Sequence, residues 1–105
     1  MTAEYVRVAR TSDIAPGTVK VVVVHDQEIA ICNVGGRYYA IDNVCTHDGG
    51  SLDQGELDEE AIECPRHGAR FDVRTGAVLA MPAVAPVGAY PVRVQGTEIE
   101  VAVER

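Results

Sequence analysis

Cys45-Thr46-His47 and Cys64-Pro65-Arg66-His67 are separated by sixteen residues in this chain of 105 residues. Each motif joins one cysteine to one histidine, and glycines follow both, at Gly49-Gly50 and at Gly68. Thiolate is a soft ligand and imidazole a borderline one, so these four side chains suit a thiophilic metal. Because one short loop cannot present four ligands around a tetrahedral centre, the pattern predicts two loops that converge on one metal site.

Two kinds of metal centre fit this donor set. A structural zinc site with two cysteines and two histidines usually has the spacings C-x2-4-C and H-x3-5-H, whereas here each pair is mixed. The mixed pairs fit a [2Fe–2S] centre in which two histidines replace two cysteines on one iron. A third interpretation is that the motif is accidental, and it predicts that Cys45→Ser leaves the fold unharmed.

The chain resembles the Rieske-type iron–sulfur proteins, whose signature is C-x-H, a spacer and C-x2-H. The likeness extends beyond the two motifs to the turn Phe71-Asp72-Val73-Arg74-Thr75-Gly76, to Met81-Pro82 and to Tyr90-Pro91-Val92-Arg93-Val94. It therefore covers roughly the whole chain. The resemblance implies one [2Fe–2S] cluster per chain, and it assigns the cluster ligands as Cys45, His47, Cys64 and His67, with the cysteines on the inner iron and the histidines on the outer, solvent-facing iron.

Short strands separated by turns predict an all-β fold. Alternating or β-branched segments indicate nine or ten strands, and His25-Asp26-Gln27 and Gly35-Gly36 are typical of hairpin turns. Val21 to Val24 are consecutive apolar residues, so we expect both faces of their strand to be covered. The acidic segment from Ser51 to Glu60 predicts a solvated loop, and Tyr90 to Val94 predicts one strand.

The resemblance also implies how these strands are arranged. It predicts a single Rieske domain over residues 1–105, built as a β-sandwich base with a small inserted cluster-binding lobe. The lobe is expected at about residues 43–69. Nothing in the pattern predicts a long helix or a second domain.

The acidic composition excludes several partners. Sixteen acidic residues against nine basic ones give a net charge of −7, which argues against nucleic acid and against an anionic membrane surface. No stretch reaches eighteen apolar residues, and the first residues lack the apolar core of a signal peptide. The negative charge favours a partner with a basic face, because electrostatic steering then speeds the encounter of the two proteins.

Two residues of the right chemistry fall outside the motif. Cys32 lies in the apolar segment Ile29-Ala30-Ile31-Cys32-Asn33, which predicts a small buried hydrophobic residue rather than a reactive thiol. His25 lies in a predicted turn, where we expect a solvated side chain. A chain with three cysteines, two of them in the motif, suits a reducing cytoplasm.

The pattern is most similar to the small Rieske ferredoxins of multicomponent bacterial oxygenases. Such proteins take single electrons from a flavin-containing NAD(P)H reductase and pass them to a terminal oxygenase. The chain would then be an electron-transfer component rather than an enzyme, with no catalytic residues. We expect a monomer that docks transiently through the surface around the cluster tip, which comprises His47, Asp48, Gly49, Arg66, His67, Gly68 and Pro82.

Two other functions stay open at this point. One is the Rieske-type small subunit of an assimilatory nitrite reductase, which would co-purify with a sirohaem-containing subunit. The other belongs to a different class, a zinc-stabilised binding module without a redox role. Colour separates the zinc module from a Rieske protein of either kind, because a zinc protein is colourless and the iron–sulfur cluster gives a red-brown solution.

The chain departs from the respiratory members of the family at four positions. Those proteins carry a disulfide between the ligand loops, where this chain has Gly50 and Arg66. They also use serine and tyrosine hydroxyls as donors to the cluster sulfurs, where this chain has Ala69 and Phe71. Fewer donors leave the negative charge on sulfur less stabilised, so we expect a potential nearer about −150 mV than +300 mV.

Overall fold

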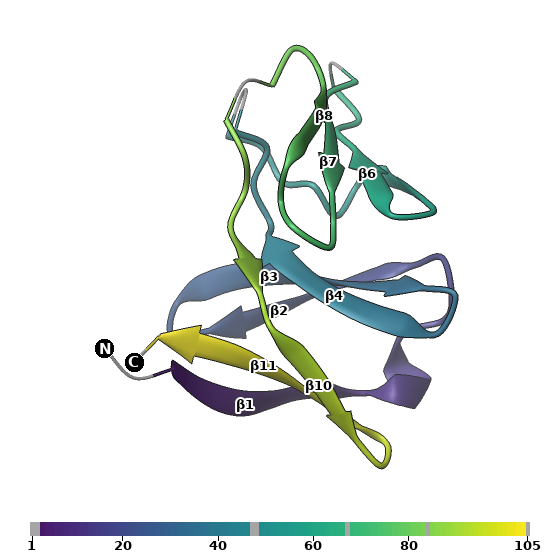
Figure 1. Ribbon diagram of the computed structural model, residues 1–105, viewed down its shortest axis with the longest axis vertical. Helices are drawn as coiled ribbons and strands as arrows, with labels where there is room; N and C mark the ends of the chain where they lie inside the picture. Colours follow the sequence, from purple (N-terminus) through teal and green to yellow (C-terminus); the bar gives the residue numbers. More distant parts are fainter. Residues whose placement is uncertain (1–2, 47–48, 67, 84, 105) are drawn as a thin grey trace.

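In the computed structural model the chain forms three antiparallel sheets, two of which lie one over the other while the third stands above them (Figure 1). The structure describes residues 3–46, 49–66, 68–83 and 85–104. In chain order the elements are β1 (Ala3–Arg10), the short 3-10 helix η1 (Thr11–Asp13), β2 (Val19–Val24), β3 (Gln27–Val34), β4 (Arg37–Asp42), β5 (Glu56–Asp58), β6 (Ala61–Glu63), β7 (Arg70–Asp72), β8 (Val78–Ala80), β9 (Ala89–Tyr90), β10 (Val92–Gln95) and β11 (Glu98–Glu104). Sheet A has the order β1-β11-β10, sheet B the order β2-β3-β4-β9, and sheet C the order β5-β6-β7-β8. The predicted all-β class is confirmed.

Sheets A and B form the sandwich base. Along β11 the side chains alternate: Glu98 and Glu100 on one face are partly exposed and Ala102 on that face is buried, whereas Ile99, Val101 and Val103 on the other face are buried in the core. These residues pack against the inward face of sheet B, and the shared core consists of Ala9, Ile14, Val24, Ile29, Ile31, Ala40, Ile99, Val101 and Val103.

Sheet B is also covered on its other face, because β3 contributes to two cores. Ile29 and Ile31 point into the sandwich, whereas Ala30 and Cys32 join a second core on the side of sheet C. Cys32 is fully buried, as predicted, and burial raises the pKa of its thiol to about 12. The prediction that the strand of Val21 to Val24 is covered on both faces is wrong. β2 lies at the edge of sheet B, and Val23 is 66% exposed.

The turns of the base follow the sequence. Gly35 and Gly36 connect β3 to β4 with φ values of 59° and 95°, which glycine adopts without steric cost. His25 and Asp26 connect β2 to β3 as an exposed two-residue turn, also with positive φ. Both hairpins are therefore confirmed, and His25 is a surface turn residue.

Two strand predictions need correction. The segment expected as a loop between the ligand motifs contains the strand β5. Its only apolar residue, Leu57, packs against the second core, and one apolar residue is too few to show the alternation that predicts a strand. The single strand expected over residues 90–94 is divided at Pro91, which has no N–H to donate to a ladder. β9 pairs with β4 in sheet B, and β10 pairs with β11 in sheet A, so the chain changes sheets at this proline.

Sheet C and the segments 43–55 and 81–88, which join it to the base, are called the lobe below. Figure 1 shows the lobe above sheet B, with the chain after β8 crossing the top of the molecule before it descends to β9. Inner residues of sheet C, including Ile62 and Phe71, belong to the second core. No helix among the described residues is long and apolar enough to cross a lipid bilayer.

Candidate metal centre

The two motif loops have the same backbone hydrogen bonds. The Cys45 N–H donates to the Gly50 carbonyl at 2.7 Å, and the Gly49 N–H donates back to the Cys45 carbonyl at 2.7 Å. In the second loop the Cys64 N–H donates to the Ala69 carbonyl at 2.7 Å, and the Gly68 N–H donates to the Cys64 carbonyl at 3.0 Å. Each loop therefore holds its cysteine at the start of an equivalent tight turn.

The same glycine geometry closes both turns. Gly49 has a φ of 76° and Gly68 a φ of 78°, values in the left-handed region that side chains with a Cβ rarely adopt. The glycine lies four residues after the cysteine in both loops, so the sequences CTHDG and CPRHG specify one backbone shape. Two matching loops of this kind can present ligands to a common centre.

Both motif cysteines belong to the second core. Cys45 and Cys64 are fully buried and pack in one apolar cluster with Leu52, Ala69 and Phe71. All three cysteines of the chain are described, and none forms a disulfide. The structure therefore brings the two predicted thiol ligands into the same interior region of the lobe.

The two histidine ligands of the prediction, His47 and His67, lie outside the described residues. Their part in the site stays a prediction. Among the residues that are described, no group of three or more His, Cys, Asp or Glu side chains is arranged to hold a metal ion.

A third segment packs against the motif loops. Ala83 is buried in the same core as both cysteines, and the Thr46 hydroxyl donates to the Ala85 carbonyl at 2.5 Å. The peptide before Pro82 is cis, and Pro82 itself is half-buried. The segment after β8 is thus attached to the first motif loop.

An arginine bridges the two motif loops. Arg66 of the second loop donates from its guanidinium to the Ser51 carbonyl of the first loop at 3.0 Å. A Cβ placed on Gly50 would collide with that same guanidinium. Positions 50 and 66, where the resemblance places disulfide cysteines in the respiratory proteins, therefore lie side by side, and here an arginine side chain links the loops without a covalent bond.

Asn43 anchors the base of the first motif loop. Its side-chain oxygen accepts hydrogen bonds from the N–H groups of Leu52 and Asp53 at 3.0 Å and 2.9 Å. Its amide nitrogen donates to the carboxylates of Glu28 and Asp53 at 3.0 Å and 3.1 Å. Partial burial raises the pKa of Asp53, but hydrogen bonds from Asn43 and from its neighbours outweigh that effect and lower it.

Replacing Asn43 by aspartate should destabilise the lobe. The aspartate still accepts the hydrogen bonds from the Leu52 and Asp53 N–H groups. Its second oxygen, however, replaces the amide NH2 and faces the carboxylates of Glu28 and Asp53, so negative charges repel one another there. Because Asn43 is buried, we expect a loss of about 2–4 kcal/mol in the free energy of unfolding at neutral pH. The new carboxyl group should have a raised pKa, so stability should recover as the pH falls through it. Urea titration followed by visible absorbance measures the loss.

The matched control exchanges the two groups. In Asn43→Asp/Asp53→Asn an amide again faces a carboxylate, so part of the lost stability should return. Equal stability of Asn43→Asp and the wild type would contradict the anchoring role. The sequence offered only a weak signal for this residue, namely a short polar side chain between a strand and a motif loop.

Comparison with known proteins identifies the fold family. The family described as "Rieske [2Fe-2S] domain" matches residues 4–91. The chain belongs to this Rieske family. It is 38% identical over 99 residues to the ferredoxin component of the naphthalene 1,2-dioxygenase system of Pseudomonas putida, covering 94% of this chain and 95% of that protein.

Solved structures extend the likeness. The ferredoxin of carbazole 1,9a-dioxygenase from Nocardioides aromaticivorans IC177 has a TM-score of 0.91 and 46% identity, covering 95% of this chain and 98% of that one. A ferredoxin in a complex of reduced oxygenase and oxidized ferredoxin in carbazole 1,9a-dioxygenase has a TM-score of 0.87 and 39% identity, covering 93% and 92%.

The described residues fit the family's cofactor. A [2Fe–2S] cluster needs thiolate ligands inside the protein, and the two buried cysteines at the starts of matching turns supply them. As a Rieske protein the chain carries a Rieske [2Fe–2S] cluster. The zinc-stabilised module is therefore not the function of this chain.

Proposed function

We propose that this chain is the ferredoxin component of a ring-hydroxylating dioxygenase system. In that role it receives single electrons from a flavin-containing NAD(P)H reductase and passes them to a terminal oxygenase. The observation that carries the proposal is the pair of matching, glycine-closed loops that bury Cys45 and Cys64 in one core. Relatives that match nearly the whole chain are named as ferredoxin components of such systems.

The residues of the chain then have distinct tasks. When bound, the cluster accepts one electron and later releases it. Cys45 and Cys64 would hold the cluster from the core, and His47 and His67 would be its other two ligands. The chain works as an electron-transfer component rather than a catalyst, so a partner needs access to the tip and no substrate pocket is required.

The remaining parts of the proposal concern the setting. Docking is transient and takes place at the tip, because one site must serve a reductase and an oxygenase in turn. The same need favours a monomer. The three cysteines without a disulfide are typical of a reducing compartment, and we place the chain in the cytoplasm.

The small subunit of a nitrite reductase is a less supported alternative. The relatives described above are components of dioxygenase systems and are 38% to 46% identical to this chain, whereas a solved structure described as a "putative NADH-dependent nitrite reductase small subunit" is 22% identical. Co-purification with a sirohaem-containing subunit would select the nitrite reductase instead.

EPR spectroscopy of the dithionite-reduced protein tests the function directly. Anaerobically prepared protein should be red-brown, contain two irons and two acid-labile sulfides per chain, and give the EPR signal of a reduced [2Fe–2S] cluster. Material without iron or sulfide, or with zinc in their place, would overturn the proposal.

A further inference from the structure

Met81 has an unusual position for an apolar side chain. It is 80% exposed, the largest fraction among the exposed large hydrophobic residues of the described chain, and Leu79 two positions earlier is 53% exposed. Successive side chains of a strand alternate, so in β8 Leu79 projects away from the core that Val78 packs against, and Met81 lies in the turn that follows the strand. Single exposed hydrophobic residues are common on protein surfaces, so the location decides whether Met81 matters.

The location is the end of the lobe where the cysteine loops lie. Two residues after Met81, Ala83 is buried in the core that contains both cysteines, and Thr46 of the first loop hydrogen-bonds to Ala85. In Figure 1 the chain after β8 crosses the top of the molecule at this point. Electron tunnelling weakens steeply with distance, so a redox partner must cover this end and with it Met81.

The segment around Met81 differs from its surroundings in charge. Residues 75–92 are eighteen consecutive positions without a charged side chain. In contrast, residues 43–69 hold seven of the sixteen acidic residues and one of the nine basic residues. The lobe therefore combines an uncharged segment with a strongly acidic one.

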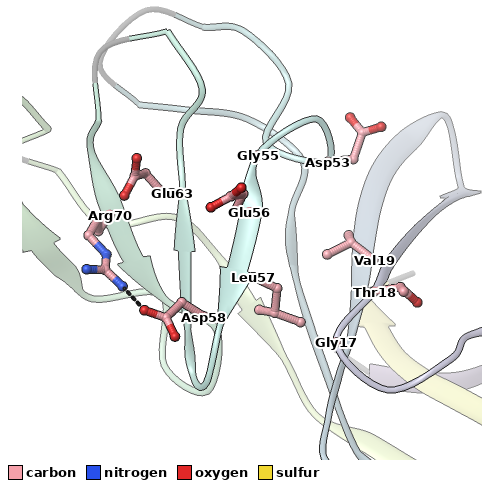
Figure 2. Close-up of a pocket in the computed structure, with 10 residues that line it drawn as sticks. All are labelled: Gly17, Thr18, Val19, Asp53, Gly55, Glu56, Leu57, Asp58, Glu63 and Arg70. Atoms are coloured by element: carbon pink, nitrogen blue, oxygen red, sulfur yellow. Dashed lines mark hydrogen bonds and ion pairs between the residues drawn. The ribbon is translucent and has the colours of Figure 1, made fainter.

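Figure 2 shows part of that acidic segment around a pocket of about 520 Å³, which lies between the lobe and the base residues Gly17, Thr18 and Val19. Glu56 and Glu63 are direct cross-strand partners, and like charges in that arrangement destabilise a sheet. Arg70 pairs with Asp58 at 3.2 Å, so the other carboxylates leave a net negative face. This face, defined by Asp53, Glu56, Asp58 and Glu63, is complementary to a basic surface.

We propose that Met81 is an apolar docking anchor that inserts into a socket on the terminal oxygenase. This socket lies beside the redox centre of the oxygenase, and basic residues surround it. The proposal rests on the proposed function and adds the residue and the surface chemistry that recognise the acceptor. Interface cores are enriched in methionine and depleted of aspartate and glutamate, whereas charged residues belong to the rim. Met81, just after β8, would supply the apolar contact, and the acidic face on β5 and β6 would steer the partner at longer range.

The chemistry of methionine suits a carrier. Its unbranched, polarizable side chain adapts to irregular sockets, so it can form contacts quickly and release them. The acidic face raises the encounter rate, and Met81 then fixes the contact. In each productive encounter one electron leaves the reduced chain and enters the oxidised oxygenase.

The experiment measures electron transfer to a defined acceptor, the terminal oxygenase of carbazole 1,9a-dioxygenase from Nocardioides aromaticivorans IC177, which is itself a solved structure. Reduced chain is mixed with oxidised oxygenase in a stopped-flow instrument, and the second-order rate constant is recorded. Met81→Ala and Met81→Gln should be slower than the wild type by about 5- to 10-fold. Met81→Leu, which stays apolar and of similar size, should remain within about twofold.

Val23→Ala is the matched control, because Val23 is 66% exposed but lies on β2 in the base. This variant should react at the wild-type rate. All variants should give the wild-type EPR spectrum and midpoint potential, because neither side chain is a cluster ligand. Raising the ionic strength should slow the wild type and Met81→Ala by the same factor, since salt screens the acidic face alone.

Several outcomes would overturn the proposal. Met81→Ala at the wild-type rate would exclude the anchor while leaving the electron-carrier function intact. Equal losses in Met81→Ala and Val23→Ala would show a general surface effect. A loss confined to reduction by the reductase of the naphthalene system would assign Met81 to the other partner. A wild-type chain with an intact cluster that reduces no oxygenase would remove the proposed function together with the anchor.

Discussion

Cys45→Ser and Cys64→Ser should each yield a protein without a [2Fe–2S] cluster, which is the largest effect that a single substitution in this chain can have. Thiolate is the ligand that iron–sulfur clusters require from the interior of the protein, and a serine hydroxyl does not ionise near neutral pH. Both cysteines are fully buried, so no exposed side chain nearby can replace them. Iron and sulfide analysis and visible absorbance measure the loss.

The structure offers a matched control for this result. Cys32 is as deeply buried as the two motif cysteines and belongs to the same core, but it lies on β3 and its thiol has a pKa of about 12. Cys32→Ala should therefore retain the full cluster content. A Cys45→Ser protein with wild-type iron content, or a Cys32→Ala protein without iron, would contradict the assignment of the ligands.

Loss of the cluster should also affect the lobe more than the base. Ligand binding to a metal centre contributes to folding free energy, and the second core contains both motif cysteines. The sandwich core between sheets A and B contains neither of them. Hydrogen exchange of Cys64→Ser should therefore show lost protection in sheet C and retained protection in β11.

The parts of this fold that sequence predicts are those with a local physical cause. The hairpin at Gly35 and Gly36 follows from the need for positive φ, and the alternation of β11 follows from one wet and one buried face. The meeting of Cys45 and Cys64 in one core agrees with the thiolate half of the predicted ligand set, whereas the histidine half stays a prediction. Each of these can be read from a few neighbouring residues.

Other features depend on contacts between distant segments. β5 exists because it pairs with β6, although its own sequence Glu56-Leu57-Asp58 has a single apolar residue. The Arg66 bridge to Ser51 and the Asn43 anchor join residues that are ten or more positions apart or lie in different loops. A polar residue in the sequence gives no indication of which distant carbonyl or carboxylate it will meet.

The low midpoint potential stays a prediction. Ala69 and Phe71 are both fully buried in the core with the motif cysteines, and neither side chain has a hydroxyl to donate to a cluster sulfur. Because alanine and phenylalanine have no hydroxyl group, neither residue can raise the midpoint potential by donating a hydrogen bond to a cluster sulfur. The predicted lobe boundary at about residues 43–69 also stays a prediction, while sheet C continues through β8 to Ala80.

Gly76→Ala should strongly destabilise the protein although it leaves the motif untouched. Gly76 has a φ of 82°, and its carbonyl accepts a hydrogen bond from the Val87 N–H at 2.9 Å. A Cβ at this position would overlap the backbone carbonyl of Val87, which cannot rotate away as a side chain would. Val87 is buried in the core with the motif cysteines, so a shift of its backbone disturbs the lobe.

Gly17→Ala isolates that steric effect, because Gly17 has nearly the same φ, 81°, but no atom lies within 4 Å of the position that an alanine Cβ would take there. The left-handed conformation alone should cost the Gly17 variant about 1–2 kcal/mol in the free energy of unfolding. The Gly76 variant should lose at least about 4 kcal/mol or fail to fold, because the backbone collision adds to the conformational cost. Anaerobic urea titration of both variants, followed by circular dichroism and visible absorbance, gives the comparison. Equal losses in the two variants would mean that the segment at Val87 moves freely and is not a fixed support of the lobe.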